Sequence, residues 1–339
     1  MSGSHLNPLQ RSAREIMRRP PVEDLRAEDL VSPERLLQAY GRAGGFSAKG
    51  LSAAADILEA MWRDAGATVF LSFPADIIAT GTRGLIRELI ARGLVDAVIT
   101  TCGTLDHDLA RASRPYYQGD WLLDDRELAR QHIYRLGNLV IPQANYGGII
   151  EKEMRRILAG LWRKGVRTLS TRDLVWAIGE HLGPKRGKDS ICRAAFEQKV
   201  PVFVPGITDG AVGSQMWLYW QDHKELTIDL FADEQALSDI VFTARRTHAI
   251  MLGGGISKHH TIWWNQFRGG LDSAIYLTTA VEWDGSLSGA RLREAVSWGK
   301  VRPDAREVTV EGDVTSLFPF LVGGVLGRLG DLKRARVRG

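Results

Sequence analysis

Six short apolar runs, separated by segments with helical periodicity, constrain the fold of this chain more than any other feature. The runs are residues 68–71, 97–100, 201–204, 249–252, 274–278 and 308–310. Short continuous apolar strands that alternate with helices are typical of a parallel sheet that helices cover on both faces. The pattern therefore predicts an α/β fold with a doubly wound, mostly parallel, Rossmann-like sheet.

Helical segments fill the intervals between these runs. Apolar residues at helical spacing predict helices over residues 52–64, 77–92, 149–164, 171–181, 233–246, 290–298 and 315–326. Ser32-Pro33 predicts one more helix start, since Ser suits the N-cap and Pro the first helical turn. The alternation contains no clear linker, so we expect a single domain over residues 31–330. Outside it lie an N-terminal extension (residues 1–30), in which residues 9–18 could form a short helix, and a basic tail (residues 331–339).

The composition excludes several classes of protein. The net charge is +4 over 339 residues, and so slight an excess gives no reason to expect a nucleic-acid partner. Cys102 and Cys192 form no CxxC pair, which argues against a disulfide framework and a cysteine zinc site. No apolar run is long enough to span a membrane, and the N-terminus lacks the hydrophobic segment of a signal peptide. We therefore expect a cytoplasmic protein.

Four of the predicted strands end in small or hydroxyl residues. Ligands of doubly wound sheets bind outside the carboxyl ends of the strands, where helix N-termini can hold phosphates. None of the four turns is a GxGxxG or Walker loop, and a glycine after a strand is usually only a tight turn. Four such turns at one edge nevertheless favour a dinucleotide cofactor. The turns are Ser72-Phe-Pro-Ala-Asp76 with Ala79-Thr-Gly81, Thr100-Thr-Cys-Gly-Thr104, Gly206-Ile-Thr-Asp209 and Gly253-Gly-Gly255.

Lys300 is the strongest candidate for a reactive side chain. It closes the segment Glu294-Ala-Val-Ser-Trp-Gly-Lys300, in which Glu294 and Trp298 share one helical face. A carboxylate and an indole so placed could flank an amine ligand through ion pairing and cation–π contact. An amine that an indole shields from water loses its proton more readily and becomes a nucleophile. The simpler alternative is a solvated cation at a helix C-terminus.

Two histidine-containing clusters raise the question of a metal. Asp106-His-Asp108 and His259-His260 hold ligand types of zinc and iron, but no pair has the i, i+4 spacing of a helical zinc site. Polar residues that line a cleft are the simpler interpretation, so we predict no metal. His259 could also act as a general base.

Three segments identify a family resemblance. Leu252-Gly-Gly-Gly-Ile-Ser-Lys-His-His260, Glu282-Trp-Asp-Gly-Ser286 and Ser288-Gly-Ala-Arg-Leu-Arg-Glu-Ala-Val-Ser-Trp-Gly-Lys300 resemble the deoxyhypusine synthase family. Shorter matches occur in the same order over roughly residues 30–328, namely Thr100-Thr-Cys-Gly, Gly137-Asn-Leu139, Thr208-Asp-Gly210 and Phe318-Pro319.

The resemblance implies an NAD-dependent transferase. In that family, NAD takes a hydride from spermidine, and the aminobutyl group passes to a lysine of the enzyme as an imine. The group then moves to a lysine of translation initiation factor 5A and is reduced there. The family forms homotetramers with active sites shared across a dimer interface, and an N-terminal segment can cover a neighbour's site, as residues 7–18 could here.

The resemblance also assigns residues by motif position. Lys300 would form the imine and His259 would assist proton transfer. The amine would contact Gly254, His259, Gly285, Ser286, Glu294, Trp298 and His107. The NAD site would be lined by Ala75, Asp76, Ala79, Thr101, Cys102, Gly103, Asp209, Thr279, Ala280, Asp313 and Val314.

Four positions depart from the better-known pattern of the family. Leu287, Ser214 and His107 stand where it has acids, and Trp263 stands where it has an asparagine. Fewer acids should weaken the grip on a polycation. The donor could therefore be another amine, such as a diamine or agmatine, or other acids could compensate, namely Asp106, Asp108 or Asp284.

Three alternatives to deoxyhypusine synthesis stay open at this point. The first is a homospermidine-synthase-like transferase that passes the aminobutyl group to a free amine. The second is a non-catalytic relative that retains NAD. The third, with least support, is a metal hydrolase built from His107, His259 and His260.

Overall fold

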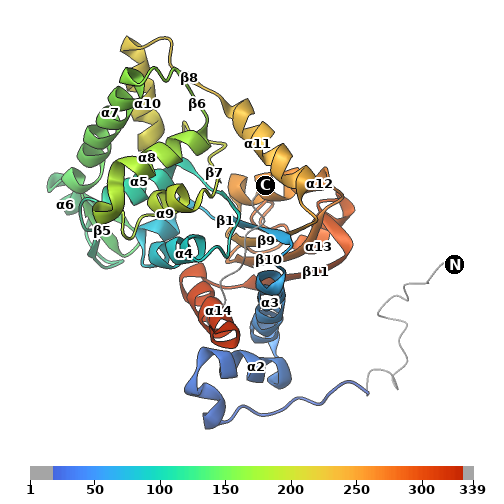
Figure 1. The fold of residues 1–339 in the computed structure, drawn as a ribbon. Helices are drawn as coiled ribbons and strands as arrows, with labels where there is room; N and C mark the ends of the chain where they lie inside the picture. Colours follow the sequence, from blue (N-terminus) through green and yellow to red (C-terminus); the bar gives the residue numbers. More distant parts are fainter. Residues whose placement is uncertain (1–17, 331–339) are drawn as a thin grey trace.

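A central sheet of six parallel strands organises the chain. The computed structural model describes residues 18–330, and Figure 1 shows the sheet enclosed by helices. The strand order is β11-β10-β9-β1-β2-β7, and each neighbouring pair is parallel. The strands are β1 (Ala67–Ser72), β2 (Ala97–Ile99), β7 (Val202–Phe203), β9 (Arg246–Leu252), β10 (Leu271–Thr278) and β11 (Val301–Glu311).

Alternate side chains of these strands enter two separate apolar cores, because successive residues of a strand point to opposite faces. In β9, Ile250 and Leu252 belong to the larger core, and Ala249 and Met251 to the smaller one. The smaller core is covered by α11 (Leu230–Thr243), α12 (Gly255–Gln266) and α13 (Leu292–Ser297). The larger core is covered by α2 (Pro33–Ala43), α3 (Phe46–Arg63), α4 (Thr82–Ala91), α5 (Cys102–Arg111), α7 (Gly147–Arg163), α8 (Thr171–Arg186), α9 (Ile191–Gln198), α10 (Ala211–Asp222) and α14 (Val314–Leu329). Helices on both faces confirm the predicted fold class.

The remaining elements are short. An antiparallel sheet with the order β3-β5-β4 and a parallel pair, β6 and β8, lie apart from the main sheet. They comprise β3 (Tyr117–Gln118), β4 (Ile133–Leu136), β5 (Leu139–Pro142), β6 (Thr168–Leu169) and β8 (Thr227–Ile228), accompanied by α6 (Asp125–Arg130) and the 3₁₀ helices η2 (Ala27–Val31), η3 (Ala75–Ala79) and η4 (Gln143–Asn145).

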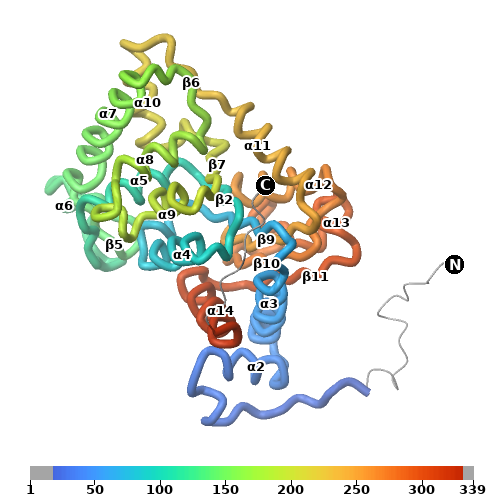
Figure 2. Tube along the Cα trace, viewed as in Figure 1, coloured from blue at the N-terminus to red at the C-terminus, as the bar shows by residue number. Residues whose placement is uncertain are grey.

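The N-terminal part of the described chain runs along the outside of the body, before α2 (Figure 2). It is fastened there by Glu23, whose N–H donates to the carbonyl of Arg42 at 3.2 Å and whose carboxylate pairs with the Arg42 guanidinium at 3.0 Å. The helix predicted over residues 9–18, apart from Arg18, and the basic tail fall outside the described residues. The division of the chain into an extension, one domain and a tail stays a prediction.

Several predicted boundaries were wrong for physical reasons. The helix predicted over 77–92 is divided into η3 and α4, and the helix predicted over 233–246 ends at Thr243, since Arg246 begins β9. The run at 308–310 is only part of β11, whose first half carries Arg302, Asp304 and Arg306. Charged side chains are tolerated there because β11 is an edge strand. Helices α5, α6, α9, α10 and α12 were not predicted.

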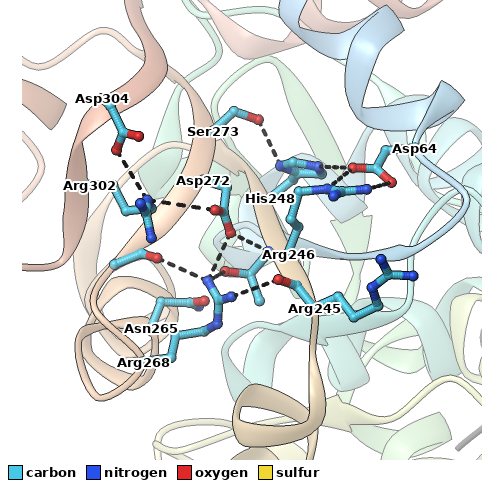
Figure 3. Close-up of polar contacts among 12 residues, drawn as sticks. Asp64, Arg245, Arg246, His248, Asn265, Arg268, Asp272, Ser273, Arg302 and Asp304 are labelled. Carbon is cyan, nitrogen blue, oxygen red and sulfur yellow. Dashed lines mark hydrogen bonds and ion pairs between the residues drawn. The ribbon is translucent and has the colours of Figure 1, made fainter.

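A network of ion pairs holds the amino ends of the strands next to α3 (Figure 3). Asp64, which follows α3, accepts from Arg246 at 2.5 and 2.7 Å. His248 lies between Asp64, at 3.4 Å, and the hydroxyl of Ser273 on β10, at 2.9 Å. Hydrogen bonds from Arg246 keep the pKa of Asp64 far below its usual value. The network therefore fixes β9 and β10 at the edge opposite their carboxyl ends.

Asp108 is a fully buried carboxylate that links several helices around the larger core. Its carboxylate accepts from Arg83 on α4 at 2.7 Å and from the Ser190 hydroxyl at 2.6 Å, and also from the N–H groups of Ile191 and Cys192 at 3.0 and 2.9 Å. Burial opposes its ionisation, but the charge of Arg83 and these hydrogen bonds hold the pKa of Asp108 below its usual value. One carboxylate thus joins α4, α5 and the start of α9.

We expect Asp108→Asn to lower the free energy of unfolding by about 3–5 kcal/mol, because it leaves the buried Arg83 without its counter-charge. Because the folded pKa of Asp108 is depressed, this contribution is complete at neutral pH and is lost as the pH falls through that value. Urea unfolding at pH 7 measures it. The matched control is Asp125→Asn, which breaks a surface pair with Arg135 and should change stability little. Equal effects of the two substitutions would contradict the assignment.

Candidate active site

The turn that ends α13 determines where Lys300 lies. Gly299 has a φ of +68°, a conformation that glycine adopts without strain. The Lys300 N–H donates to the carbonyl of Ala295 at 3.0 Å, and the Gly299 N–H to that of Val296 at 3.0 Å. These two bonds form a Schellman motif, the usual glycine-dependent helix end. The Trp-Gly-Lys sequence therefore reverses the chain at Gly299 and leads it directly into β11.

Lys300 is held against the sheet by its backbone and reaches α12 with its side chain. Its carbonyl accepts from the N–H of Leu271, at the start of β10, at 3.1 Å. The side chain is buried, and its Nζ lies 3.5 Å from Nε2 of His259. The alternative of a solvated terminal cation is therefore wrong.

Two indoles border the Lys300 amine. Its Nζ lies 5.2 Å from the ring centroid of Trp298 and 5.6 Å from that of Trp263. Both rings are themselves partly open to solvent, with 62% and 42% of Trp298 and Trp263 exposed. The amine is thus screened by aromatic faces, while the rim of the site stays accessible to a ligand.

His259 has the properties of a proton acceptor. It lies in α12, one residue after the buried Lys258 and next to the Lys300 amine. Burial is the largest cause that lowers its pKa below the usual value, and the charges of Lys300, His260 and Lys258 lower it further. The imidazole is therefore neutral at pH 7, and one ring nitrogen is directed to the amine of Lys300.

The other predicted amine contacts lie in two places. Glu294 is exposed in the first turn of α13, and Gly285 and Ser286 lie in the exposed loop before it. Gly254 packs so tightly beneath this loop that a Cβ atom would come within 2.2 Å of the Ser288 hydroxyl. His107 lies on α5 instead, where its Nδ1 is 3.0 Å from the Tyr116 hydroxyl. Burial lowers the pKa of His107 to about 4.

The predicted cofactor residues gather at the carboxyl edge of the sheet. A Cβ atom on Gly103 would lie 2.8 Å from that of Ala75, so the turns after β1 and β2 are in contact. Gly253 links this group to β10, because its N–H donates to Leu277 at 2.8 Å while its Cα packs on Pro74. Near Asp313, the Gly312 N–H donates to the carbonyl of Thr278, the last residue of β10, at 2.9 Å. These contacts bring together the turns that carry Ala75, Asp76, Ala79, Thr101, Cys102, Gly103, Thr279, Ala280, Asp313 and Val314.

The side chains at this edge fit a dinucleotide. Asp76, Asp209 and Asp313 are exposed carboxylates of the kind that accept ribose hydroxyls. Helices α5 and α14 begin here without a hydrogen bond from a capping side chain, and such helix N-termini suit phosphate. A cavity of about 410 Å³ adjoins Ala79 and Val314 and is lined by Thr80, Gly81, Thr82, Leu85, Thr315, Pro319, Val322, Gly323 and Leu326. The side chain of Cys102 is buried, so this residue offers a ligand only its backbone.

Two of the acids that could compensate for the missing carboxylates, Asp106 and Asp108, instead bind backbone N–H groups at the starts of helices. Asp106 accepts from the N–H groups of Ala211 and Val212 at 2.8 and 2.7 Å and from the Tyr146 hydroxyl at 3.0 Å, which anchors the start of α10. Asp108 anchors α9 in the same way. Neither carboxylate is available to a donor amine. Asp284, in contrast, is exposed in the loop before α13.

The three histidines of the metal hypothesis have different partners. His107 contacts Tyr116, His259 contacts Lys300, and His260 pairs with Glu234 at 3.1 Å. Over residues 18–330, no three His, Cys, Asp or Glu side chains are grouped as a metal site requires. The same residues include no helix that could cross a bilayer.

Lys258 is a residue of the site that the sequence did not single out. It is only 1% exposed, and its Nζ donates to the carbonyls of Leu287 and Ala290 at 2.9 and 2.5 Å. Burial lowers the pKa of Lys258 to about 8. Its position directly before His259 was a signal of this role in the sequence, but the two carbonyls that it binds belong to residues 29 and 32 positions later in the chain.

Comparisons with known proteins identify a family over most of the chain. The family model described as deoxyhypusine synthase matches residues 35–325. A protein of Picrophilus torridus is 49% identical over 306 residues, which are 90% of this chain and 97% of that protein. A protein of Thermoplasma acidophilum is 50% identical over 313 residues, 92% and 99% of the two chains. Both are named "Probable deoxyhypusine synthase".

Solved structures show the same fold at low sequence identity. A crystal structure described as "a putative deoxyhypusine synthase from Entamoeba histolytica" has a TM-score of 0.61 and 17% identity, over 90% of this chain and 97% of that one. A ternary complex of AgrE with ornithine and NAD⁺ has a TM-score of 0.52 and 13% identity, over 84% of this chain and 34% of that one.

Replacing Lys300 tests the contact with His259 directly. Lys300→Met should raise the pKa of His259 towards its usual value, because a neighbouring positive charge that disfavours the imidazolium is removed. Lys300→Arg keeps the charge and should leave the pKa of His259 closer to that of the unmodified protein. NMR titration of the ring resonances measures both. An unchanged pKa in Lys300→Met would show that the imidazole does not sense this side chain.

Proposed function

The chain belongs to the deoxyhypusine synthase family of transferases, and we propose that it moves an aminobutyl group from spermidine or a related amine, by way of Lys300, to a lysine of translation initiation factor 5A. The observation that carries this proposal is the buried Lys300 amine, 3.5 Å from a neutral His259 and bordered by two indoles. That arrangement suits a lysine that forms an imine, because the neutral imidazole can accept the proton of the ammonium group and leave the amine as a nucleophile.

The chain's own groups account for the transfer steps. Lys300 Nζ would attack the oxidised carbon of the donor and displace its amine, forming the enzyme-bound imine. His259 would accept the proton that Lys300 loses and return it to the departing amine. The lysine of the acceptor protein would then displace Lys300 in the same manner. A single imidazole next to the amine can serve both exchanges.

NAD fits the carboxyl edge of the sheet described above. When bound, it would supply the oxidation of the donor and the later reduction of the transferred imine. Asp76, Asp209 and Asp313 would hold its ribose hydroxyls, and the turns after β1, β2 and β10 would surround the rest. The loop 279–291 begins at this cofactor edge, at Thr279, and ends at α13, which leads to Lys300.

The donor amine would be held mainly by aromatic faces. Trp298 and Trp263 offer ring surfaces for an ammonium group, and Glu294 and Asp284 are the exposed acids of α13 and of the loop before it. Trp263 and Phe267 form an edge-to-face pair on the open rim of the site. We infer that a second subunit covers this apolar rim in a cytoplasmic homotetramer and completes the grip on the donor.

A second function is transfer of the aminobutyl group to a free amine. The observation that favours it is that few acids are available to bind the donor. Leu287 is apolar, and the Ser214 hydroxyl donates to the Gly210 carbonyl at 3.0 Å. Asp106 already accepts from the N–H of Ala211 at the start of α10. A weaker hold on a polycation would suit a smaller donor. A non-catalytic relative is the remaining alternative.

Borohydride trapping tests the proposed role of Lys300. With NAD and a labelled aminobutyl donor, reduction should fix the label on the peptide that contains Lys300, since an imine at this amine becomes a stable secondary amine. Peptide mass spectrometry locates the label. Lys300→Arg should be unlabelled, and omission of NAD should abolish labelling. A label on another lysine, or none in the complete mixture, would overturn the proposal.

A donor and acceptor panel separates the candidate functions. Spermidine, putrescine and agmatine are each incubated with NAD, with and without the purified factor 5A precursor, and products are identified by mass spectrometry. We expect a mass gain on the factor that Lys300→Ala abolishes. Products formed only between free amines would favour the second function, and no Lys300-dependent turnover with any pair would favour the non-catalytic alternative.

A further inference from the structure

Lys258 carries a buried ammonium group that the transfer steps do not use. Within residues 18–330 no carboxylate lies at ion-pair distance from it, and the charge of Glu294 favours the protonated amine only from farther away. A buried cation without a direct partner is costly. Its compensation is three contacts: the carbonyls of Leu287 and Ala290, and the ring of Tyr276, whose centroid lies 3.9 Å from Nζ. All three partners belong to β10 or to the loop 279–291.

The loop 279–291 directs a row of carbonyls inwards onto these side chains. Between the two carbonyls bound by Lys258, that of Ser288 accepts from the Tyr276 hydroxyl at 2.5 Å. The Thr278 hydroxyl lies 3.4 Å from the same carbonyl. On its outer side the loop exposes residues 281–287, which include Gly285 and Ser286. Its inner side is therefore fixed by hydrogen bonds, and its outer side carries the predicted donor contacts Gly285 and Ser286.

The loop is attached to both halves of the candidate site. Its first residues, Thr279 and Ala280, belong to the predicted cofactor edge, and its last, Arg291, pairs with Glu311 on β11 immediately before α13. A displacement of the loop would therefore move its own ligand contacts and the start of the helix that carries Glu294 and Trp298.

We propose that Lys258 is a positioning residue, which fastens the loop 279–291 so that the donor-binding groups of the loop and of α13 stay aligned with Lys300. Adjacent residues of α12 then have separate tasks: His259 contacts the amine that reacts, and Lys258 fixes the loop that presents the donor. This inference rests on the proposed function for its kinetic consequences, but the fastening itself is a property of the fold.

Lys258→Met tests the proposal, because methionine fills a similar space but donates no hydrogen bond. The donor KM should rise by about tenfold or more while kcat at saturating donor changes far less, the pattern of lost binding rather than lost chemistry. Borohydride trapping at Lys300 should persist at saturating donor. Lys258→Arg, which can still donate to both carbonyls, should recover part of the KM. The matched control is Lys188→Met, on an exposed lysine paired only with Asp189.

Hydrogen exchange makes the test independent of activity. Amides of the loop should exchange faster in Lys258→Met than in the unmodified protein, while β1 and β2 keep their protection. An unchanged donor KM together with unchanged loop exchange would overturn the proposal, and so would loss of trapping at saturating donor in a folded variant, which would make Lys258 part of the chemistry. If the unmodified protein turns over no amine, the proposed function fails, and loop exchange alone still decides whether Lys258 fastens the loop.

Discussion

The approach of the Lys300 amine to His259 depends on two helices, α12 and α13, that cover the same face of the sheet. α12 starts at the carboxyl end of β9 and presents His259 in its second turn, whereas Lys300 follows the reversal at Gly299 and is held beside the first residue of β10. Neither group could be moved independently, because each is fixed by the backbone of an element that packs into the smaller core. The sheet and the elements packed on it therefore position Lys300 and His259, and the contact does not depend on a flexible loop.

The sequence was sufficient where a local pattern determines structure. Apolar runs located five of the six main strands to within a few residues, and the Ser-Trp-Gly-Lys segment marked the lysine at the centre of the site. The start of β11 escaped because Arg302, Asp304 and Arg306 interrupt the apolar pattern at an edge. The sequence did not predict α12 because a run of three glycines precedes or starts it and a mixed polar run follows, and its helical state depends on packing against the sheet.

Side-chain partners that are distant in the chain were beyond prediction. Asp106 and Asp108 belong to a triplet whose residue types suggest a ligand cluster. Each instead anchors the start of another helix: Asp106 binds an N–H of α10, 106 residues later, and Asp108 binds one of α9, 84 residues later. Lys258 precedes a histidine of obvious interest, but its role becomes visible only with the carbonyls of Leu287 and Ala290 in place. Such residues are found by asking what satisfies a buried charge, and sequence alone does not answer that question.

This site has fewer acids with which to hold an amine than the better-known pattern of the family. The buried acids Asp106 and Asp108 bind the N–H groups at the starts of α10 and α9, so their oxygens are not available to a ligand. What remains are two indole faces and a few exposed carboxylates, and each is placed by the loop 279–291 or by α12 and α13. Ring faces bind an ammonium group with less energy than a buried ion pair but without the cost of desolvating an acid. Affinity for the donor would then depend on how firmly those elements are held, and the buried ammonium of Lys258 holds one of them although it takes no part in the transfer steps.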